Sequence, residues 1–421
     1  MNSRKALNKL IIVAALGYFV DIYDILLFGV ERTVSLKEIL PHQFPDFSAE
    51  KLAELNAYYG KILLNWQMGG MLIGGLFWGI LGDKKGRLTV LFGSILTYSL
   101  ANIANGFVQT TNWYAALRFI SGFGLAGELG AGITLVSETM SKEKRGIGTM
   151  IVATVGVFGA VVAGFMGGVI ENWRHSYFLG GTMGLALLLL RIGVLESGMY
   201  KNVKEENVKL GNFFDLFTNA TRLKKYLCII FVTVPVWYVM GTLVLFSPEL
   251  YGKLSGNPEN AKLITAGNAI MFAYAGITVG DLLCGLISQK WRSRKKTLAL
   301  FLFFTILCMV LYFTMGGNSV ATFYTIICLI GFATGYWAVF ISTASELFGT
   351  NIRSTATTTA PNFVRGSTIL ISYLLTGMTA IFGKEGLTAT IATGAIIMTI
   401  AFIALYFLEE TFGKDLNYTE N

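Results

Sequence analysis

The sequence predicts an all-α membrane protein with twelve transmembrane helices, arranged as two six-helix bundles related by pseudosymmetry. Three observations lead to this prediction: an apolar composition, apolar segments long enough to cross a bilayer, and a charged signature that occurs once in each half. Of the 421 residues, 54% are hydrophobic and only 14% are charged, whereas soluble domains carry roughly 25% charged residues. Backbone groups in lipid must be hydrogen-bonded internally, so apolar segments of this length are expected to be helices.

Apolar segments of about 20 residues, the length that spans a bilayer as a helix, recur along the whole chain. We place twelve spans at 10–30, 60–81, 88–110, 113–136, 146–170, 175–195, 226–248, 266–288, 297–317, 320–344, 356–381 and 386–408. They define an N-terminal bundle at 1–195, a cytoplasmic linker at 196–225, a C-terminal bundle at 226–408 and a cytoplasmic tail at 409–421. The longest outer loop is expected at 31–59. The first span follows a basic start but lacks a small-residue cleavage site, so we expect it to be retained.

The net charge of +8 is explained by membrane topology and not by a nucleic-acid partner. If the N-terminus is cytoplasmic, most basic residues fall in the N-terminal segment, the linker and the loops on that same side, which is the positive-inside pattern. Twelve spans then place both termini in the cytoplasm. The four cysteines all lie in apolar spans without paired spacing, so we interpret them as packing residues. We expect the bilayer as partner and a functional monomer.

A charged signature repeats about half a chain apart. Glu138 is followed seven residues later by Arg145, and Glu346 is followed seven residues later by Arg353. Each glutamate follows a long apolar segment and each arginine begins the next one. This indicates two homologous halves, the parallel repeat expected of a transporter with an alternating-access design. Channels and sensors do not require such a repeat.

The loop between the second and third spans reads Gly82-Asp83-Lys84-Lys85-Gly86-Arg87. Its glycines permit a tight turn, and its aspartate can accept charge-assisted hydrogen bonds. The loop resembles the Gly-x-x-x-Asp-x-x-Gly-Arg-[Arg/Lys] signature of the major facilitator superfamily. The second half has a degraded copy, in which Gln289 stands in place of the aspartate and is followed by Lys290-Trp291-Arg292-Ser293-Arg294. The simpler alternative is a basic loop that reflects topology alone.

The fourth span contains Arg118 and Glu128, which are costly at this depth and therefore indicate function. Its glycines match Gly-x-Gly-x-x-Gly, but they lie inside an apolar span and not between a strand and a helix, so close helix packing explains them better than a nucleotide. The stretch from Ala126 to Ala131 resembles the Gly-Gly-Glu-x-Gly-Gly-Ala pattern of metabolite:proton symporters. Related sugar porters share the arginine and the glycines.

Two aspartates, Asp21 and Asp24, lie three residues apart in the first span and so on one helix face. Asp24 and Arg118 lie at a similar depth, which makes an ion pair between them geometrically feasible. Tyr23-Asp24 matches the Tyr-Asp of sugar porters and metabolite symporters. That resemblance implies that Asp24 takes up a proton and that Arg118 modulates its pKa; a static ion pair is the alternative.

The spans hold four carboxylates against two well-buried arginines, Arg118 and Arg365, and this excess favours a titrating carboxylate. Asp21, Glu128 and Asp281 are therefore further candidates for proton coupling. The same excess leaves a cationic substrate or Na⁺ open.

The stretch from Arg353 to Arg365 resembles the eleventh-span pattern of organic anion transporters, which implies that Arg365, together with Arg118, binds an anionic substrate. Five aromatic residues are candidates for the cavity wall, although core packing explains each of them equally well: Trp237, Tyr238, Tyr274, Tyr336 and Trp337. A hexose is disfavoured, because the fifth and seventh spans contain neither glutamine nor asparagine.

The resemblance also implies an inner gate on the cytoplasmic face. In such transporters a charged set forms ion pairs between the halves when the cavity opens outward, and these pairs break when it opens inward. The corresponding residues here are Asp83, Arg87, Glu138, Arg145, Glu346 and Arg353.

These observations predict a secondary transporter of a bacterial cytoplasmic (inner) membrane that moves a small organic anion by alternating access, coupled to proton symport. A facilitator, an exporter, or a symporter of a zwitterionic, cationic or sugar-like metabolite on the same fold is the alternative. An enzyme is not expected, because the chain has only two histidines, His42 and His175, and no nucleophile elbow or metal-ligand spacing. We therefore expect neither a cofactor nor a metal.

Overall fold

The computed structural model describes residues 2–141, 144–191, 213–383 and 387–420, and within these ranges every regular element is a helix. The first half comprises α1 (Asn2–Gln43), α2 (Ala49–Lys85), α3 (Arg87–Asn105), α4 (Thr111–Leu125), α5 (Glu128–Thr139), α6 (Arg145–Val169) and α7 (Trp173–Leu190). The short α9 (Asp215–Thr218) precedes the second half. That half comprises α10 (Ala220–Tyr238), η1 (Val239–Val244), α11 (Ser247–Leu254), η2 (Pro258–Leu263), α12 (Ala266–Trp291), α13 (Arg294–Met315), α14 (Val320–Ala333), α15 (Trp337–Leu347), α16 (Arg353–Phe382) and α17 (Thr388–Phe407).

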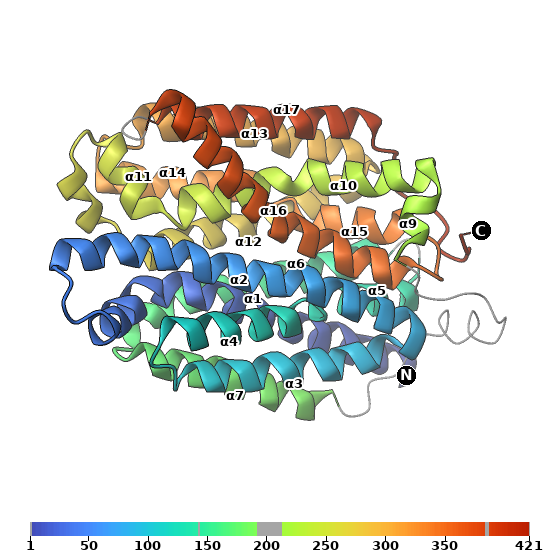
Figure 1. Cartoon of the computed structure of the whole chain (residues 1–421). Helices are drawn as coiled ribbons and strands as arrows, with labels where there is room; N and C mark the ends of the chain where they lie inside the picture. The colour runs from blue at the N-terminus through green and yellow to red at the C-terminus, as the bar shows by residue number, and fades with distance from the viewer. Residues whose placement is uncertain (1, 142–143, 192–212, 384–386, 421) are drawn as a thin grey trace.

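Long helices run side by side through the whole molecule (Figure 1). Ten helical stretches in the described residues are long and apolar enough to cross a membrane. Helices α2 and α7 pack among them, α2 against α4 and α7 against α3, so the arrangement is consistent with twelve spans. The prediction of an all-α membrane fold is confirmed for this part of the chain.

The two ends of the chain lie at the same end of the bundle, while α11 and the connection between α1 and α2 lie at the opposite end (Figure 1). Most of the predicted linker at 196–225 falls outside the described residues; its last part forms α9 and the first turn of α10. The expected outer loop at 31–59 is wrong. Helix α1 continues to Gln43 and α2 begins at Ala49, so charged residues that suggested a loop lie on helical extensions.

Two spans are broken at equivalent places in the two halves. The fourth consists of α4 and α5, separated at Ala126-Gly127, and the tenth consists of α14 and α15, separated at 334–336. Gly335 passes so close to α12 that a Cβ atom there would lie 2.7 Å from the backbone nitrogen of Asp281. Each break creates a helix N-terminus inside the bundle, where unpaired N–H groups and a partial positive charge become available.

The halves meet along α1, α2, α5 and α6 from the first half and α12, α15 and α16 from the second. Glycine allows the closest of these approaches. A Cβ atom on Gly130 of α5 would lie 2.3 Å from the Cα atom of Thr358 on α16. The interface is therefore tightly packed around the central region that contains the polar residues described next.

Candidate functional site

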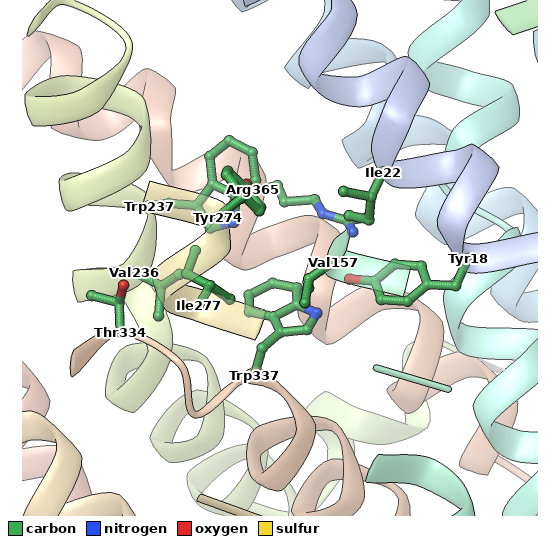
Figure 2. Close-up of a pocket in the computed structure, with 10 residues that line it drawn as sticks. All are labelled: Tyr18, Ile22, Val157, Val236, Trp237, Tyr274, Ile277, Thr334, Trp337 and Arg365. Atoms are coloured by element: carbon green, nitrogen blue, oxygen red, sulfur yellow. The ribbon is translucent and has the colours of Figure 1, made fainter. Parts of the chain in front are cut away.

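A small cavity lies between the two halves (Figure 2). Both halves supply its lining: Tyr18, Ile22 and Val157 from the first half, and Val236, Trp237, Tyr274, Ile277, Thr334, Trp337 and Arg365 from the second. Trp337 is the first residue of α15, so the break before that helix opens directly onto the cavity. The wall is mainly aromatic and aliphatic, and Arg365 is the one charged residue among these lining residues.

Arg365 projects from α16 across the cavity, with its guanidinium group directed toward Tyr18 on α1 (Figure 2). The residue is only 1% exposed. Its Nη1 donates a long hydrogen bond of 3.4 Å to Asn362 Oδ1, and its guanidinium carbon lies 5.5 Å from the centre of the Trp337 ring. Among the described residues, its Nε and Nη2 atoms have no hydrogen-bond partner, and neither has the Tyr18 hydroxyl. A buried guanidinium with free donors has the chemistry to hydrogen-bond an anion.

Asp21 belongs to the opposite half, and the Arg365 guanidinium is close enough to act on its carboxylate electrostatically. It is fully buried, and neither of its carboxylate oxygens accepts a hydrogen bond within the described chain. Asp21 adjoins Ile22, which lines the cavity. The structure thus brings the sequence candidates Arg365 and Asp21 together without a direct ion pair.

Asp24 lies one turn further along α1, also fully buried, and neither of its oxygens accepts a hydrogen bond from the part of the chain that is described. Arg118 acts on it electrostatically, but the direct ion pair that depth suggested is not formed. Arg118 Nη2 instead donates to Asn102 Oδ1 at 2.5 Å, and its guanidinium lies over the Tyr177 ring at 4.8 Å. Arg118 does not line the cavity. Asn102 was missed by the sequence reasoning, although an asparagine inside the third span was a visible signal.

Glu128 forms a buried ion pair with Arg191, and Arg191 Nη1 also donates to the carbonyl oxygen of Leu91 at 2.8 Å. Gly17 of α1 makes room for this pair, since a Cβ atom there would lie within 2.3 Å of the Arg191 guanidinium. The sequence-based charge count is therefore wrong in one respect. It treated two arginines as well buried, but Arg191 is a third, only 2% exposed, and it neutralises Glu128.

Asp281 is a residue of α12, and its side chain lies against the N-terminus of α15. Its Oδ1 accepts a hydrogen bond from the backbone N–H of Ala338 at 3.0 Å, and α15 begins one residue earlier, at Trp337. A carboxylate in this position is stabilised by the positive end of the helix dipole. Asp281 therefore provides an acceptor for one of the backbone N–H groups that the break in the tenth span leaves without an intrahelical partner. The sequence did not reveal this structural role.

Of the five predicted aromatic residues, three line the cavity: Trp237, Tyr274 and Trp337. Tyr238 and Tyr336 do not. The Tyr238 hydroxyl donates to the Thr390 carbonyl at 2.7 Å, and the Tyr336 hydroxyl donates to the Val232 carbonyl at 3.1 Å. These two tyrosines join helices within the second half.

Glu138 is the centre of the first charged network at the end of the bundle that holds both termini. It accepts hydrogen bonds from Arg87 Nη2 at 2.9 Å and from Arg353 Nη1 at 3.1 Å. Asp83 pairs with Arg87 at 3.4 Å and also accepts from the backbone N–H of Thr355 at 2.8 Å. Since α16 begins at Arg353, Asp83 at the end of α2 lies at the N-terminus of a helix from the other half.

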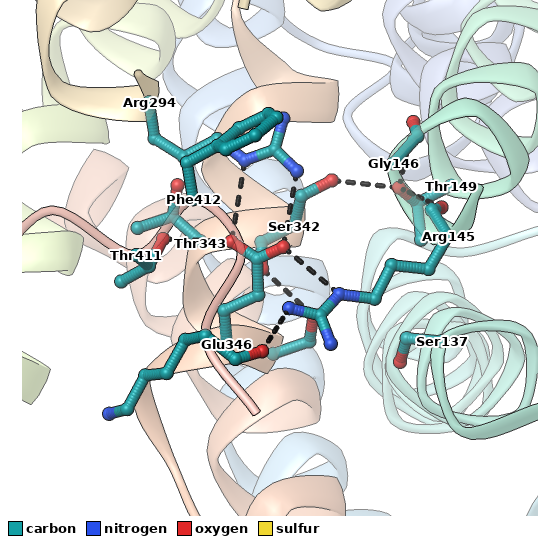
Figure 3. Close-up of polar contacts among 12 residues, drawn as sticks. Ser137, Arg145, Gly146, Thr149, Arg294, Ser342, Thr343, Glu346, Thr411 and Phe412 are labelled. Atoms are coloured by element: carbon teal, nitrogen blue, oxygen red, sulfur yellow. Dashed lines mark hydrogen bonds and ion pairs between the residues drawn. The ribbon is translucent and has the colours of Figure 1, made fainter. Parts of the chain in front are cut away.

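Glu346 is the centre of the second network, and Arg145 and Arg294 converge on it (Figure 3). Arg145 Nε lies 3.3 Å and Arg294 Nη2 lies 3.1 Å from Glu346 Oε1. The Thr411 hydroxyl donates to Glu346 Oε2 at 2.8 Å. All six predicted gate residues thus fall into two networks that join the halves. Arg294 was missed as a member, although it ends the degraded copy of the loop signature.

The C-terminal segment after α17 crosses these networks. Arg353 Nη2 donates to the carbonyl oxygen of Leu416 at 2.5 Å, and Arg145 Nη2 donates to that of Lys414 at 2.6 Å. The backbone N–H of Thr350 donates to the carbonyl oxygen of Tyr418 at 2.8 Å. The segment predicted as a tail therefore supplies acceptors to arginines of both halves.

Glu410 anchors the start of this segment on α13. It accepts hydrogen bonds from the Ser293 hydroxyl at 2.5 Å and from the backbone N–H of Arg294 at 2.9 Å. Burial raises the pKa of the Glu410 carboxyl, but these hydrogen bonds and one from the Phe412 N–H outweigh burial, so its pKa is lowered from the ordinary value. The anchor is therefore ionised at neutral pH and weakens as the pH falls through that lowered pKa.

At the opposite end of the bundle, one ion pair joins the halves within the described ranges. Arg32 Nη2 of α1 lies 3.2 Å from Glu249 Oε1 of α11, and the Arg32 guanidinium lies 4.7 Å from the centre of the Phe246 ring. The sequence reasoning missed it, because Arg32 was placed in a loop. The cavity is thus bounded by charged contacts between the halves at both ends.

Two helical bundles around a central cavity, bridged by ion pairs at both ends, form the architecture of a multi-pass membrane transporter. The sequence profile of the Major Facilitator Superfamily matches residues 54–373. The chain belongs to this superfamily and is therefore a transporter and not an enzyme.

Similar proteins agree with this assignment. The 3-(3-hydroxy-phenyl)propionate transporter of Escherichia coli is 26% identical over 90% of this chain and 93% of its own length. The benzoate transport protein of Acinetobacter baylyi is 22% identical over 82% of this chain and 78% of its own. Among solved structures, a proton:xylose symporter matches with a TM-score of 0.74 at 16% identity, covering 99% of this chain and 98% of that one. That match confirms the predicted fold.

The ion pair between Glu128 and Arg191 yields a test of its structural role. Replacing Glu128 by Gln leaves a buried arginine without its counter-ion, which costs about 3–5 kcal/mol in comparable pairs. We expect a marked fall in the thermal unfolding temperature of the detergent-purified protein. The double variant Glu128→Gln, Arg191→Met removes both charges and is expected to recover most of that loss. Equal destabilisation by the single and double variants would contradict the pairing.

Proposed function

We propose that this transporter moves a small aromatic monocarboxylate by alternating access and couples it to proton symport. The observation that carries the proposal is Arg365, a buried cation with donors left free by the described residues, inside a cavity walled by Trp237, Tyr274 and Trp337. A guanidinium group binds a carboxylate through two parallel hydrogen bonds, and aromatic side chains favour contact with another flat ring. The names of the similar transporters for hydroxyphenylpropionate and benzoate support the same substrate class.

The lining also argues against a polyhydroxylated substrate. Among the described residues, the lining holds no carboxylate, glutamine or asparagine, and the Thr334 hydroxyl already donates to the Ile330 carbonyl at 2.9 Å. Its other neutral polar groups are the hydroxyls of Tyr18 and Tyr274 and the indole N–H groups of Trp237 and Trp337. Sugars require several side chains that can exchange hydrogen bonds with hydroxyl groups, because unpaired polar groups are costly when buried. One cation and an aromatic wall suit a monoanion with a ring. The likeness to the xylose symporter therefore extends to the fold and not to the substrate.

Proton coupling follows from the position of Asp21 opposite Arg365. An ionised Asp21 is the counter-ion of Arg365 and competes with a substrate carboxylate for the same cation. Protonation of Asp21 removes this competition, so the proton and the anion enter the site together. Asp24 lies within three residues of Asp21 and under the influence of Arg118, which makes it the second proton-carrying group in this proposal.

Alternating access is supported by the placement of charged contacts at both ends of the cavity. The two networks at the end with the termini break when that end opens, and the pair between Arg32 and Glu249 breaks when the other end opens. The positive-inside pattern assigns the first end to the cytoplasm, so the networks form the inner gate of a protein in a bacterial inner membrane. Their side chains interact differently in the two alternative states and so can bias the equilibrium between them.

Uptake of labelled benzoate into proteoliposomes tests the substrate assignment. We expect saturable uptake driven by an inward proton gradient. The variant Arg365→Lys keeps the charge but loses the bidentate geometry, and we expect at least a tenfold increase in KM, since a hydrogen bond to a charged group contributes about 1.5–3 kcal/mol. Arg292→Lys, at an exposed position directly after α12, is the matched control and should transport normally. An Arg365→Lys variant with unchanged KM, or uptake of xylose in place of benzoate, would overturn the assignment.

The coupling assignment is tested by Asp21→Asn, measured in two assays on the same proteoliposomes. We expect this variant to lose uptake driven by a pH gradient while it still exchanges internal for external benzoate, because exchange needs no net proton movement. Asp281→Asn is the control, since its side chain still accepts the hydrogen bond from Ala338 N–H, and it should keep gradient-driven uptake. Full gradient-driven uptake by Asp21→Asn would show that the proton is carried elsewhere.

The gate assignment is tested by the reactivity of a single cysteine at position 149, with the four native cysteines replaced. Thr149 lies in the closed interface, where its hydroxyl is 2.8 Å from that of Ser342. Glu138→Gln removes the acceptor of two arginines, so we expect a several-fold faster reaction with a maleimide added from the cytoplasmic side. Glu249→Gln weakens the opposite end and is expected to slow the reaction. Rates that change in the same direction in both variants would refute a two-ended gate.

A further inference from the structure

A groove runs along the outer surface of the second half, between α10 and α17. It is lined on α10 by residues including Leu227 and Phe231, and on α17 by Ile400, Ile403 and Phe407. These positions repeat at three or four residues, so each helix contributes one continuous face. Both helices belong to candidate membrane spans. The groove therefore lies along the membrane normal and faces lipid.

The walls of the groove are exposed and its floor is not. Ile403 is 56% exposed and Phe407 is 49% exposed, whereas Ala404 between them is 6% exposed. The small side chain of Ala404 deepens the channel between α10 and α17. A channel of this shape, open along one side and apolar throughout its length, is complementary to a hydrocarbon chain.

Basic residues gather at one end of the groove, where α10 begins and α17 ends. Lys224 lines the groove, and its Nζ lies 4.5 Å from the centre of the Phe407 ring. Lys295 Nζ donates to the carbonyl oxygen of Tyr406 at 2.7 Å, the residue before Phe407. Both ammonium groups therefore lie at the level where the two spans leave the hydrocarbon core.

The carboxylates near this cluster have other partners. Glu409 pairs with Lys225 at 3.1 Å, and Glu410 accepts from the backbone N–H groups at the start of α13. Across the described ranges no carboxylate lies within ion-pair distance of Lys224, whose ammonium group contacts the Phe407 ring. The end of the groove thus offers positive charge next to an apolar channel.

We propose that this groove binds one anionic phospholipid of the surrounding bilayer. An acyl chain lies along the channel between Phe231 and Ile403, and the phosphate group lies at Lys224 and Lys295. Charge complementarity selects the occupant, because basic clusters at the membrane surface attract anionic headgroups. A zwitterionic lipid offers the same chain but presents its own ammonium group to the lysines, so it binds less well.

Native mass spectrometry of the full chain tests this proposal. The protein is purified in detergent, incubated with equimolar phosphatidylglycerol and phosphatidylcholine of the same acyl chains, and washed. We expect one phosphatidylglycerol to be retained in preference to phosphatidylcholine. Lys224→Gln should reduce this preference about fivefold, the contribution of one lysine near an anionic lipid surface. Ile403→Trp fills the channel and should reduce retention of both lipids.

Two matched variants control for general effects of the substitutions. Lys296→Gln removes an exposed lysine at the same end of the bundle, and Leu307→Trp adds a tryptophan on an exposed position of α13. Both should retain phosphatidylglycerol as the unsubstituted protein does. Equal retention of the two lipids by that protein, or unchanged preference in Lys224→Gln, would overturn the proposal. The proposal would also be overturned if the protein were a dimer and the Ile403→Trp substitution dissociated it, because a second copy of the chain would then cover the groove.

Discussion

Ion pairs between the two halves lie at the two ends of the described bundle, whereas Arg365 and Asp21 at its central cavity form no direct ion pair, and the remaining features depend on this distribution. A buried charge is tolerated when a partner and additional hydrogen bonds compensate for the loss of water. Glu138 has two arginines, Glu346 has two arginines and a threonine, and Arg32 has Glu249. Arg365 has free donors opposite Asp21, which has no hydrogen-bond partner among the described residues. This is why we propose that the substrate and the proton bind at the centre.

Helix N-termini give the bundle a second way to hold buried carboxylates. Asp83 of α2 accepts a hydrogen bond from the backbone at the start of α16, and Asp281 of α12 accepts one from the backbone at the start of α15. The first contact crosses between the halves and the second stays within one half. This difference matters for the proposed alternating-access motion, in which a contact across the interface is exchanged while a contact within one half moves with that half as a rigid unit. The two aspartates resemble each other chemically, yet of the two only Asp83 is placed to act in a gate.

The sequence was sufficient for the features that depend on repetition along the chain. The spacing of Glu138 and Arg145, repeated at Glu346 and Arg353, indicated two homologous halves, and the resemblance to the superfamily implied that these residues form ion pairs between them. It was insufficient where the partner comes from another helix. Spacing gives the depth of a residue in the membrane but not its direction around the helix axis, so the Glu128 pair with Arg191 was missed. The helical extension at the end of α1 was also not predicted, because charged residues there suggested a loop.

The same limitation explains why Asp24 and Arg118 were expected to pair directly. Their depths agree, but Asn102 of α3 supplies the acceptor for Arg118 at 2.5 Å. An amide next to the guanidinium holds Arg118 in place without neutralising its charge, so Arg118 acts on Asp24 from a distance and does not lock it in a salt bridge. A carboxylate locked in a short ion pair resists protonation, whereas one under a weaker field from a fixed cation exchanges its proton more readily. The absence of a direct pair with Arg118 therefore supports the proposed role of Asp24 as a proton-carrying group.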